Sequence, residues 1–170
     1  MLTRLKSILA DTFVRFTGYA YSNLGRLFMR LFVGVMFIQF GIRQLVNYHT
    51  EVTTFPSILG MSSECGLIVL ITIELVCSIL IMAGFLTRLA TIPPIIAMAV
   101  AEWHILYNLL PDKSIYSITS TQPGYVPVMF IGIFLFIILA GPGKVSLDYF
   151  ISLFIINRRG KNEEEELEDV

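Results

Sequence analysis

The chain alternates between long apolar stretches and short polar segments, a pattern typical of helices that cross a bilayer. A hydrocarbon core of about 30 Å requires roughly 20 largely apolar residues in a helix. Four stretches approach this length, at about 27–46, 66–86, 89–110 and 125–140. Only a tight turn at 84–88 separates the second stretch from the third, so we expect these two helices to be antiparallel neighbours.

The flanking segments predict peripheral helices. In residues 1–23 the apolar positions recur at helical spacing between charged ones, which favours an amphipathic surface helix over a cleavable signal peptide. A Gly-Pro-Gly sequence must end the fourth helix, and residues 141–157 are then too short to cross a bilayer and are expected at its interface. Residues 158–170 form a charged tail, predicted to be disordered. The sequence therefore predicts an all-α membrane protein, with a four-transmembrane-helix bundle at 24–140 and interfacial amphipathic helices at both ends.

Composition and charge add a location and an orientation. Of the 170 residues 15% are charged, whereas a soluble domain carries roughly 25%. The net charge is −1 and no basic stripe is present, so nucleic-acid binding is not expected. With the N-terminus inside, ten of the twelve Lys and Arg residues fall in inner segments. The positive-inside rule therefore predicts a protein of the cytoplasmic (inner) membrane, with both termini cytoplasmic.

Ionisable side chains within the predicted spans are the candidates for function, because each costs at least about 2.5 kcal/mol to insert. Glu74 and Glu102 lie eight residues from the outer ends of two antiparallel spans, which predicts a similar depth of about 12 Å for both. Arg43 and Gln39, four residues apart, share a face of the first span. Together these residues predict a polar cluster that opens to the outside. The alternative is that each Glu is a protonated, hydrogen-bonded packing residue.

Other polar residues were assigned by their helical position. Cys77 and Ser78 follow Glu74 on one face and are expected to help bind a substrate. His104 is about 200° around the helix from Glu102; an interfacial role is favoured for it, although it is also a candidate substrate-binding residue. Arg30, at the inner end of the first span, is expected to reach the lipid headgroups.

The charge balance of the predicted cluster suggests its chemistry. One Arg facing two Glu leaves a negative charge uncompensated at low dielectric, so either one Glu holds a proton or a cation or second donor joins them. Such a site would suit proton exchange with a quinone or a small anionic substrate, and it would equally suit a fixed structural cluster. The sequence has no CxxC motif and no His spacing that predicts a metal site. Cys65 and Cys77 would lie about 18 Å apart on one helix, too far for a disulfide.

At these residues the chain resembles the DoxX family of small membrane proteins, over about residues 25–148. The motifs that carry the resemblance are, in order, Arg30-x-x-x-Gly34, Gly41-Ile42-Arg43, Glu74, Gly84-Phe85-Leu86-Thr87-Arg88-Leu89-Ala90, Met98-Ala99-Val100-Ala101 with His104, and Gly141-Pro142-Gly143-Lys144-Val145-Ser146-Leu147-Asp148. The family usually has Lys where Arg43 stands. The resemblance implies a four-helix membrane bundle. Some relatives are linked to thiosulfate:quinone oxidoreduction or to membrane complexes that handle oxidative stress, often with a separate partner subunit.

Two functions remain open at this stage. The first is a redox-linked membrane subunit, part of a quinone-linked oxidoreductase, in which Arg43 holds a quinone oxygen or a small sulfur anion while Glu74 and Glu102 exchange protons. Its expected partners are membrane lipid and a partner subunit or a second copy of the chain, and a quinone is the cofactor that it requires. The second is a non-enzymatic membrane scaffold, assembly factor or small-molecule permease, since no ligand set for a resident cofactor is evident.

Overall fold

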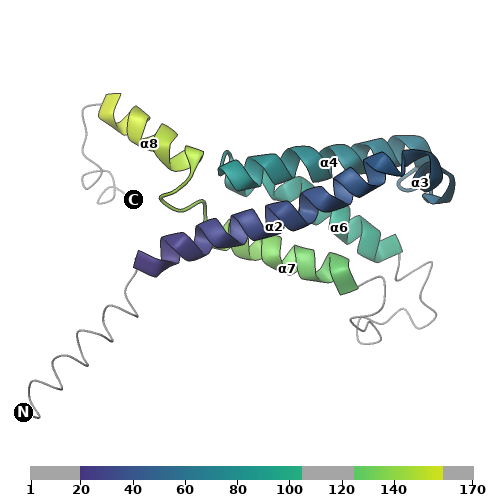
Figure 1. Cartoon of the computed structure of the whole chain (residues 1–170), viewed down its shortest axis with the longest axis horizontal. Coiled ribbons are helices and arrows are strands. Elements are labelled where there is room, and N and C mark those ends of the chain that lie inside the picture. The colour runs from purple at the N-terminus through teal and green to yellow at the C-terminus, as the bar shows by residue number, and fades with distance from the viewer. Residues whose placement is uncertain (1–19, 105–124, 159–170) are drawn as a thin grey trace, which may run out of the picture.

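The computed structural model describes residues 20–104 and 125–158, and helices are the only regular elements in these two ranges (Figure 1). They are α2 (Ala20–Val46), α3 (Tyr48–Thr54), α4 (Ser63–Ala83), α5 (Thr87–Ala90), α6 (Ile92–His104), α7 (Tyr125–Ala140) and α8 (Leu147–Arg158). The predicted all-α class is confirmed for this part of the chain. The expected N-terminal amphipathic helix and charged tail lie almost entirely outside the described residues.

Two of the helices are long and apolar enough to cross a membrane, namely Ser22–Val46 within α2 and the whole of α4. Helix α7 is a shorter apolar helix. The third predicted span corresponds to α5 and α6, which are described up to His104; its remainder lies in the segment 105–124, outside the described residues. The structure therefore supports membrane helices, whereas the complete four-span topology stays a prediction.

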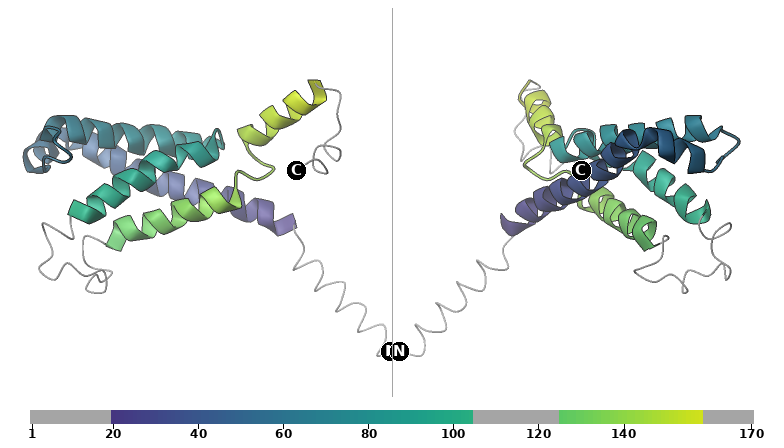
Figure 2. Two further views of the ribbon diagram at one scale, coloured as in Figure 1. Left: turned by 180° about the vertical axis from the view of Figure 1, so that it is seen from behind. Right: turned by 45° about the vertical axis from the view of Figure 1, so that its right-hand side comes forward.

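Helices α2 and α4 pack closely along their length because glycines of α2 face α4 (Figures 1 and 2). A Cβ atom at Gly34 would collide with the Cγ atom of Met82, and one at Gly41 would lie 3.0 Å from the Cβ atom of Glu74. The absence of side chains at these two positions lets the helix backbones approach, as in many membrane helix pairs.

An aromatic cluster joins α2 to α7 at the centre of the bundle. The ring of Phe37 lies 5.3 Å from that of Phe130 and 5.2 Å from that of Phe134 (centroid distances). Val33, Ile81 and Met98 extend this buried core to α4 and α6. Many large apolar side chains on the outer faces of α2, α4 and α7 are exposed. Such helices require an apolar surrounding, which lipid provides.

The turn after α4 is held by the first turn of α8. Gly84 ends α4 in the left-handed conformation, with φ +72°. Asp148 accepts hydrogen bonds from the backbone N–H groups of Leu86 (2.6 Å) and Thr87 (2.9 Å), and its own N–H donates to the carbonyl oxygen of Gly84 (2.9 Å). The predicted turn at 84–88 is thus present, and a segment about sixty residues further along the chain stabilises it.

The expectation that Arg30 reaches the lipid headgroups is wrong. Its side chain is only 1% exposed, and Nη2 donates to the carbonyl oxygen of Val145. The carbonyl oxygen of Val145 in the α7–α8 link and the nearby carboxylate of Asp148 attract the guanidinium inward. The sequence pattern could not show that Arg30 is buried, because Val145 and Asp148 lie more than a hundred residues further along the chain.

Candidate functional site

Glu74 lies on the face of α4 that is turned into the bundle and is 2% exposed. Its Oε1 atom accepts a hydrogen bond from Nε2 of Gln44 on α2, at 3.3 Å, and its Oε2 atom is buried without a partner among the described residues. Ser78, one turn later, donates through Oγ to the backbone carbonyl of Glu74. The local site is therefore a buried carboxyl group that is half satisfied by an amide.

The side chain that reaches Glu74 from α2 is Gln44, whereas Gln39 and Arg43 are exposed. The sequence analysis missed Gln44, although a signal existed. Phe37, Gly41 and Gln44 recur at spacings of four and three residues, which places Gln44 on the buried stripe of α2. Gln39 follows Phe37 by two residues and Arg43 follows Gly41 by two residues, so each lies about 200° around the helix from a member of that stripe.

Glu102 lies on the buried face of α6, in a stripe with Pro94 and Met98 at intervals of four residues. It is 7% exposed, and both of its carboxyl oxygens are buried without a hydrogen-bond partner among the described residues. It therefore makes no hydrogen bond with Glu74 there. Helices α4 and α6 diverge from their shared turn, as both views show (Figures 1 and 2). The joint cluster of the two acids stays a prediction.

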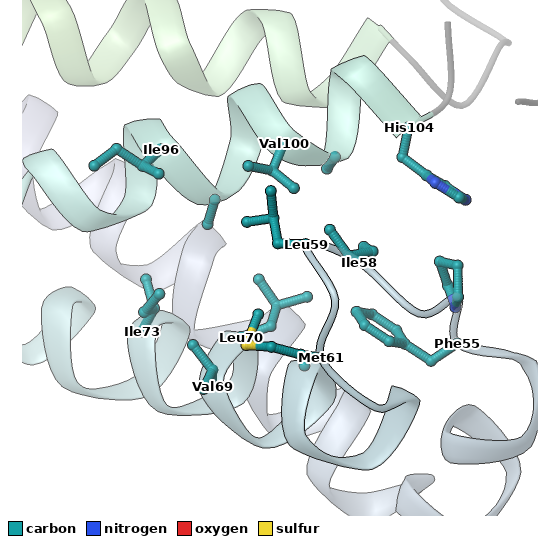
Figure 3. A pocket seen from close by; sticks show the side chains of 14 residues that line it. Phe55, Ile58, Leu59, Met61, Val69, Leu70, Ile73, Ile96, Val100 and His104 are labelled. Atoms are coloured by element: carbon teal, nitrogen blue, oxygen red, sulfur yellow. The ribbon is translucent and has the colours of Figure 1, made fainter. Parts of the chain in front are cut away.

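A pocket of about 280 Å³ lies between the first half of α4, the second half of α6 and the segment before α4 (Figure 3). The side chains that line it are Phe55, Pro56, Ile58, Leu59, Met61, Gly66, Val69, Leu70, Ile73, Ile96, Ala97, Val100, Ala101 and His104. His104 and Phe55 lie at one end, and Ile73 and Ile96 lie at the other. His104 supplies a polar ring to a lining that is otherwise almost wholly apolar.

The lid of this pocket is the segment 55–61, which lies between the first two predicted spans. Its signal was its apolar content, with Phe55, Ile58, Leu59 and Met61 in a segment outside the predicted spans. Phe55 rests on α4 where Gly66 leaves room, since a Cβ atom there would lie 3.1 Å from its ring. The loop thus folds back over the helices because its side chains are too apolar for water.

The pocket and the buried acids lie on different faces of the same helices. On α4 the pocket takes Val69, Leu70 and Ile73, while Glu74 belongs to the buried stripe. On α6 the pocket takes His104, while Glu102 is buried in the bundle. The candidate site residues therefore fall into three places: the bundle interior (Glu74, Cys77, Ser78, Glu102), the pocket (His104) and an exposed face (Gln39, Arg43).

The residues that line the pocket suit a neutral, lipophilic ligand better than a metal ion. No group of three or more His, Cys, Asp or Glu side chains that could hold a metal occurs within 20–104 and 125–158. Cys65 and Cys77 are free thiols, exposed and buried respectively, which confirms that they do not pair. An apolar pocket with one well-placed polar group is the usual form of a small-molecule site.

Comparison with known proteins gives one match. The sequence model of the DoxX family matches residues 25–106, which confirms the resemblance noted from the motifs. This range contains most of α2 and the whole of α3 to α6, and so it contains both the pocket and the two buried acids. No curated protein and no solved structure matched the chain.

Proposed function

Because the chain belongs to the DoxX family of membrane proteins, we propose that it is a redox-linked membrane subunit that binds a quinone in the pocket between α4 and α6. The observation that carries the proposal is the pocket itself, about 280 Å³ of apolar space with His104 at one end. A quinone has matching parts, since its ring carries two carbonyl acceptors and its tail is purely hydrocarbon. The imidazole would donate to a ring carbonyl, and the tail would leave between the helices into lipid.

A small sulfur anion fits this pocket less well. Desolvating an anion is costly unless cations or several donors replace its water. Arg43, the cation expected to hold it, is exposed and does not line the pocket. We therefore narrow the proposal from a quinone or anion to a quinone.

In this proposal Glu74 and Glu102 exchange protons with the quinone site. A quinone takes up two electrons and two protons to become a quinol, and we infer that a partner subunit supplies the electrons. Carboxyl oxygens that are buried without partners favour a proton on the acid, because an unpaired charge at low dielectric is costly. Oε2 of Glu74 and both oxygens of Glu102 are in this situation within the described chain.

The proposal includes four spans in the cytoplasmic membrane, with both termini inside. Helices α2, α4 and α7, together with α5–α6 and the residues that follow, would cross in alternating directions. The start of α2 and the start of α8 lie toward one end of the bundle, and α3 lies toward the other (Figures 1 and 2). The distribution of Lys and Arg assigns the α8 end to the cytoplasm.

The pocket can be tested by filling it in the full-length protein, purified in a mild detergent. We expect the wild type to bind a quinone with a short isoprenoid tail, measured by native mass spectrometry. Ala101→Phe, which places a ring in the pocket, should weaken binding by about tenfold or more. Ala99→Phe is the matched control, since Ala99 is exposed and does not line the pocket. Equal binding by the two variants would exclude this pocket.

The proton role of Glu74 needs a separate variant. Glu74→Gln keeps the shape of the side chain and its reach to Gln44 but cannot release a proton. We expect quinone reduction in native membranes to fall by about a hundredfold, with unchanged quinone binding and membrane insertion. Glu64→Gln, at an exposed carboxyl group, should have wild-type activity. Full activity of Glu74→Gln would remove the proton role, and quinone binding would then favour a carrier or scaffold.

A further inference from the structure

Four basic side chains of the described chain surround the segment that follows α7. A Cβ atom at Gly141 would lie 3.3 Å from Nη2 of Arg88, and one at Gly143 would lie 3.3 Å from Cδ of Arg26. Lys144 belongs to the segment itself, and Arg30 donates to the carbonyl oxygen one residue later. Residues that are distant in sequence thus bring their positive charges to one short turn.

A single carboxylate faces these cations in the described residues 20–30, 84–91 and 141–148, namely that of Asp148. Both of its oxygens are already engaged: Oδ1 accepts from the N–H of Leu86 at 2.6 Å, and Oδ2 accepts from the N–H and the Oγ1 of Thr87 at 2.9 and 3.0 Å. Arg88 and Lys144 are exposed, whereas Arg30 is buried. Among the described residues, the charge at this end of the bundle is therefore positive.

An open groove of about 330 Å³ runs beside Arg88. It is lined by Leu86, Thr87, Arg88, Leu89, Pro142 and Asp148. Leu86 and Leu89 are 49% and 61% exposed, so the groove offers a bare apolar wall below the guanidinium of Arg88. A ligand that fits must combine a negative head with a hydrocarbon part.

We propose that this groove binds an acidic phospholipid of the surrounding membrane, a site separate from the quinone pocket and independent of the proposed function. Arg88, which lines the groove, holds the phosphate, because a guanidinium can donate two parallel hydrogen bonds to phosphate oxygens, and Lys144 of the neighbouring turn adds a point charge. Leu86, Leu89 and Pro142 pack against the first part of an acyl chain. Basic pockets between membrane helices are known to select anionic headgroups in this way.

The site also explains why the turn is built from glycines. Side chains at Gly141 and Gly143 would press on Arg88 and Arg26, and both glycines adopt positive φ values of 72° and 77°. The turn therefore holds the two arginines on either side of a three-residue loop. A bound headgroup would join the α5 side of the bundle to the α7–α8 link, where Asp148 already connects them.

Native mass spectrometry of the full-length protein tests the proposal, with phosphatidylglycerol and phosphatidylcholine of identical acyl chains in equal amounts. We expect the wild type to retain phosphatidylglycerol preferentially. Each of Arg88→Gln and Lys144→Gln should weaken its retention by about fivefold, and the double variant by more. Arg43→Gln, the same change at an exposed arginine of the opposite end of α2, is the matched control and should behave as the wild type.

Two results of the lipid comparison would overturn the proposal. One is equal retention of the two lipids by the wild type, and the other is unchanged phosphatidylglycerol retention in the Arg88→Gln, Lys144→Gln double variant. Inorganic phosphate is added as a third arm: displacement of the lipid at millimolar concentration would show a simple anion site instead of a lipid groove. Thermal unfolding in phosphatidylcholine alone should be the same for all variants, since both substituted residues are exposed.

Discussion

At the scale of single residues, Gly84 occupies a position that does not accommodate a side chain. Its φ of +72° is a conformation that L side chains rarely adopt, and it ends α4. A Cβ atom there would also collide with Nη1 of Arg30 and approach the Cβ atom of Ser146 to 2.6 Å. Neither neighbour can withdraw easily, because Arg30 is buried and Ser146 is held in the α7–α8 link.

We therefore expect Gly84→Ala to destabilise the protein by about 2–4 kcal/mol, from backbone strain and overpacking together. Gly132→Ala is the control, because Gly132 lies in α7 with no atom within 4 Å of an added Cβ. That change should leave stability unaltered or raise it slightly, since Ala favours helix. Thermal unfolding in one detergent measures the stability of both variants. Equal melting temperatures would contradict the close contacts of an added Cβ atom at Gly84.

Asp148 is the second residue that holds this end together. It accepts from the N–H and hydroxyl of Thr87 and from the N–H of Leu86, and it attracts Arg30. In Asp148→Asn the amide N–H₂ would face one of these donors, and the charge opposite the guanidinium would be lost. We expect a destabilisation of about 1–3 kcal/mol. Chemical unfolding measures this loss of stability. The control is Glu51→Gln in α3, a distant acid whose replacement should cost little stability. Unchanged stability of Asp148→Asn would show that water replaces its hydrogen bonds.

At the scale of elements, the pairing of α2 with α4 depends on close backbone contact. Gly34 and Gly41 are spaced by seven residues, so they lie on one face and open it to α4. Gly41 is tight against Glu74 and Leu75, each with an atom 3.0 Å from an added Cβ. The packing of this helix pair and the position of the buried carboxyl group are thus coupled.

Gly41→Val should therefore separate the two helices, lower stability by about 1–3 kcal/mol and move Glu74 away from Gln44. Gly25→Val is the matched change in α2, where an added Cβ meets nothing within 4 Å. The expected difference in melting temperature between these variants is measured in detergent. A Gly41 variant as stable as the Gly25 variant would mean that the helix pair adjusts without cost.

At the scale of the whole molecule, two thiols report on the proposed orientation. Cys65 is exposed near the start of α4, and Cys77 is buried in its interior stripe. In the proposed topology Cys65 faces the outside. A membrane-impermeant maleimide should label the wild type in intact cells and should not label Cys65→Ser.

The converse position completes this test. Lys144→Cys in a Cys65→Ser background should react only after the membrane is opened, because the α7–α8 link is proposed to be cytoplasmic. Labelling of the Lys144→Cys variant in intact cells would reverse the orientation. The test requires only that the variants insert into the membrane at normal levels.

The sequence by itself determined the all-α class, the long apolar helices, the turn at 84–88 and the resemblance to a membrane family. These features depend on local patterns, such as runs of apolar residues, a left-handed glycine and ordered motifs. It also placed Glu74 and Glu102 among the buried groups, since an acid within an apolar helix must avoid lipid.

Only the tertiary structure decided which side chains meet. Gln44 instead of Arg43 reaches Glu74, because a small difference in helical phase turns one residue inward and the other outward. Arg30 is buried by a carbonyl more than a hundred residues away, and the pocket depends on a loop that folds back over two diverging helices. Helical periodicity shows which face of a helix is buried, as it does for Gln44, but it does not show which distant segment that face meets.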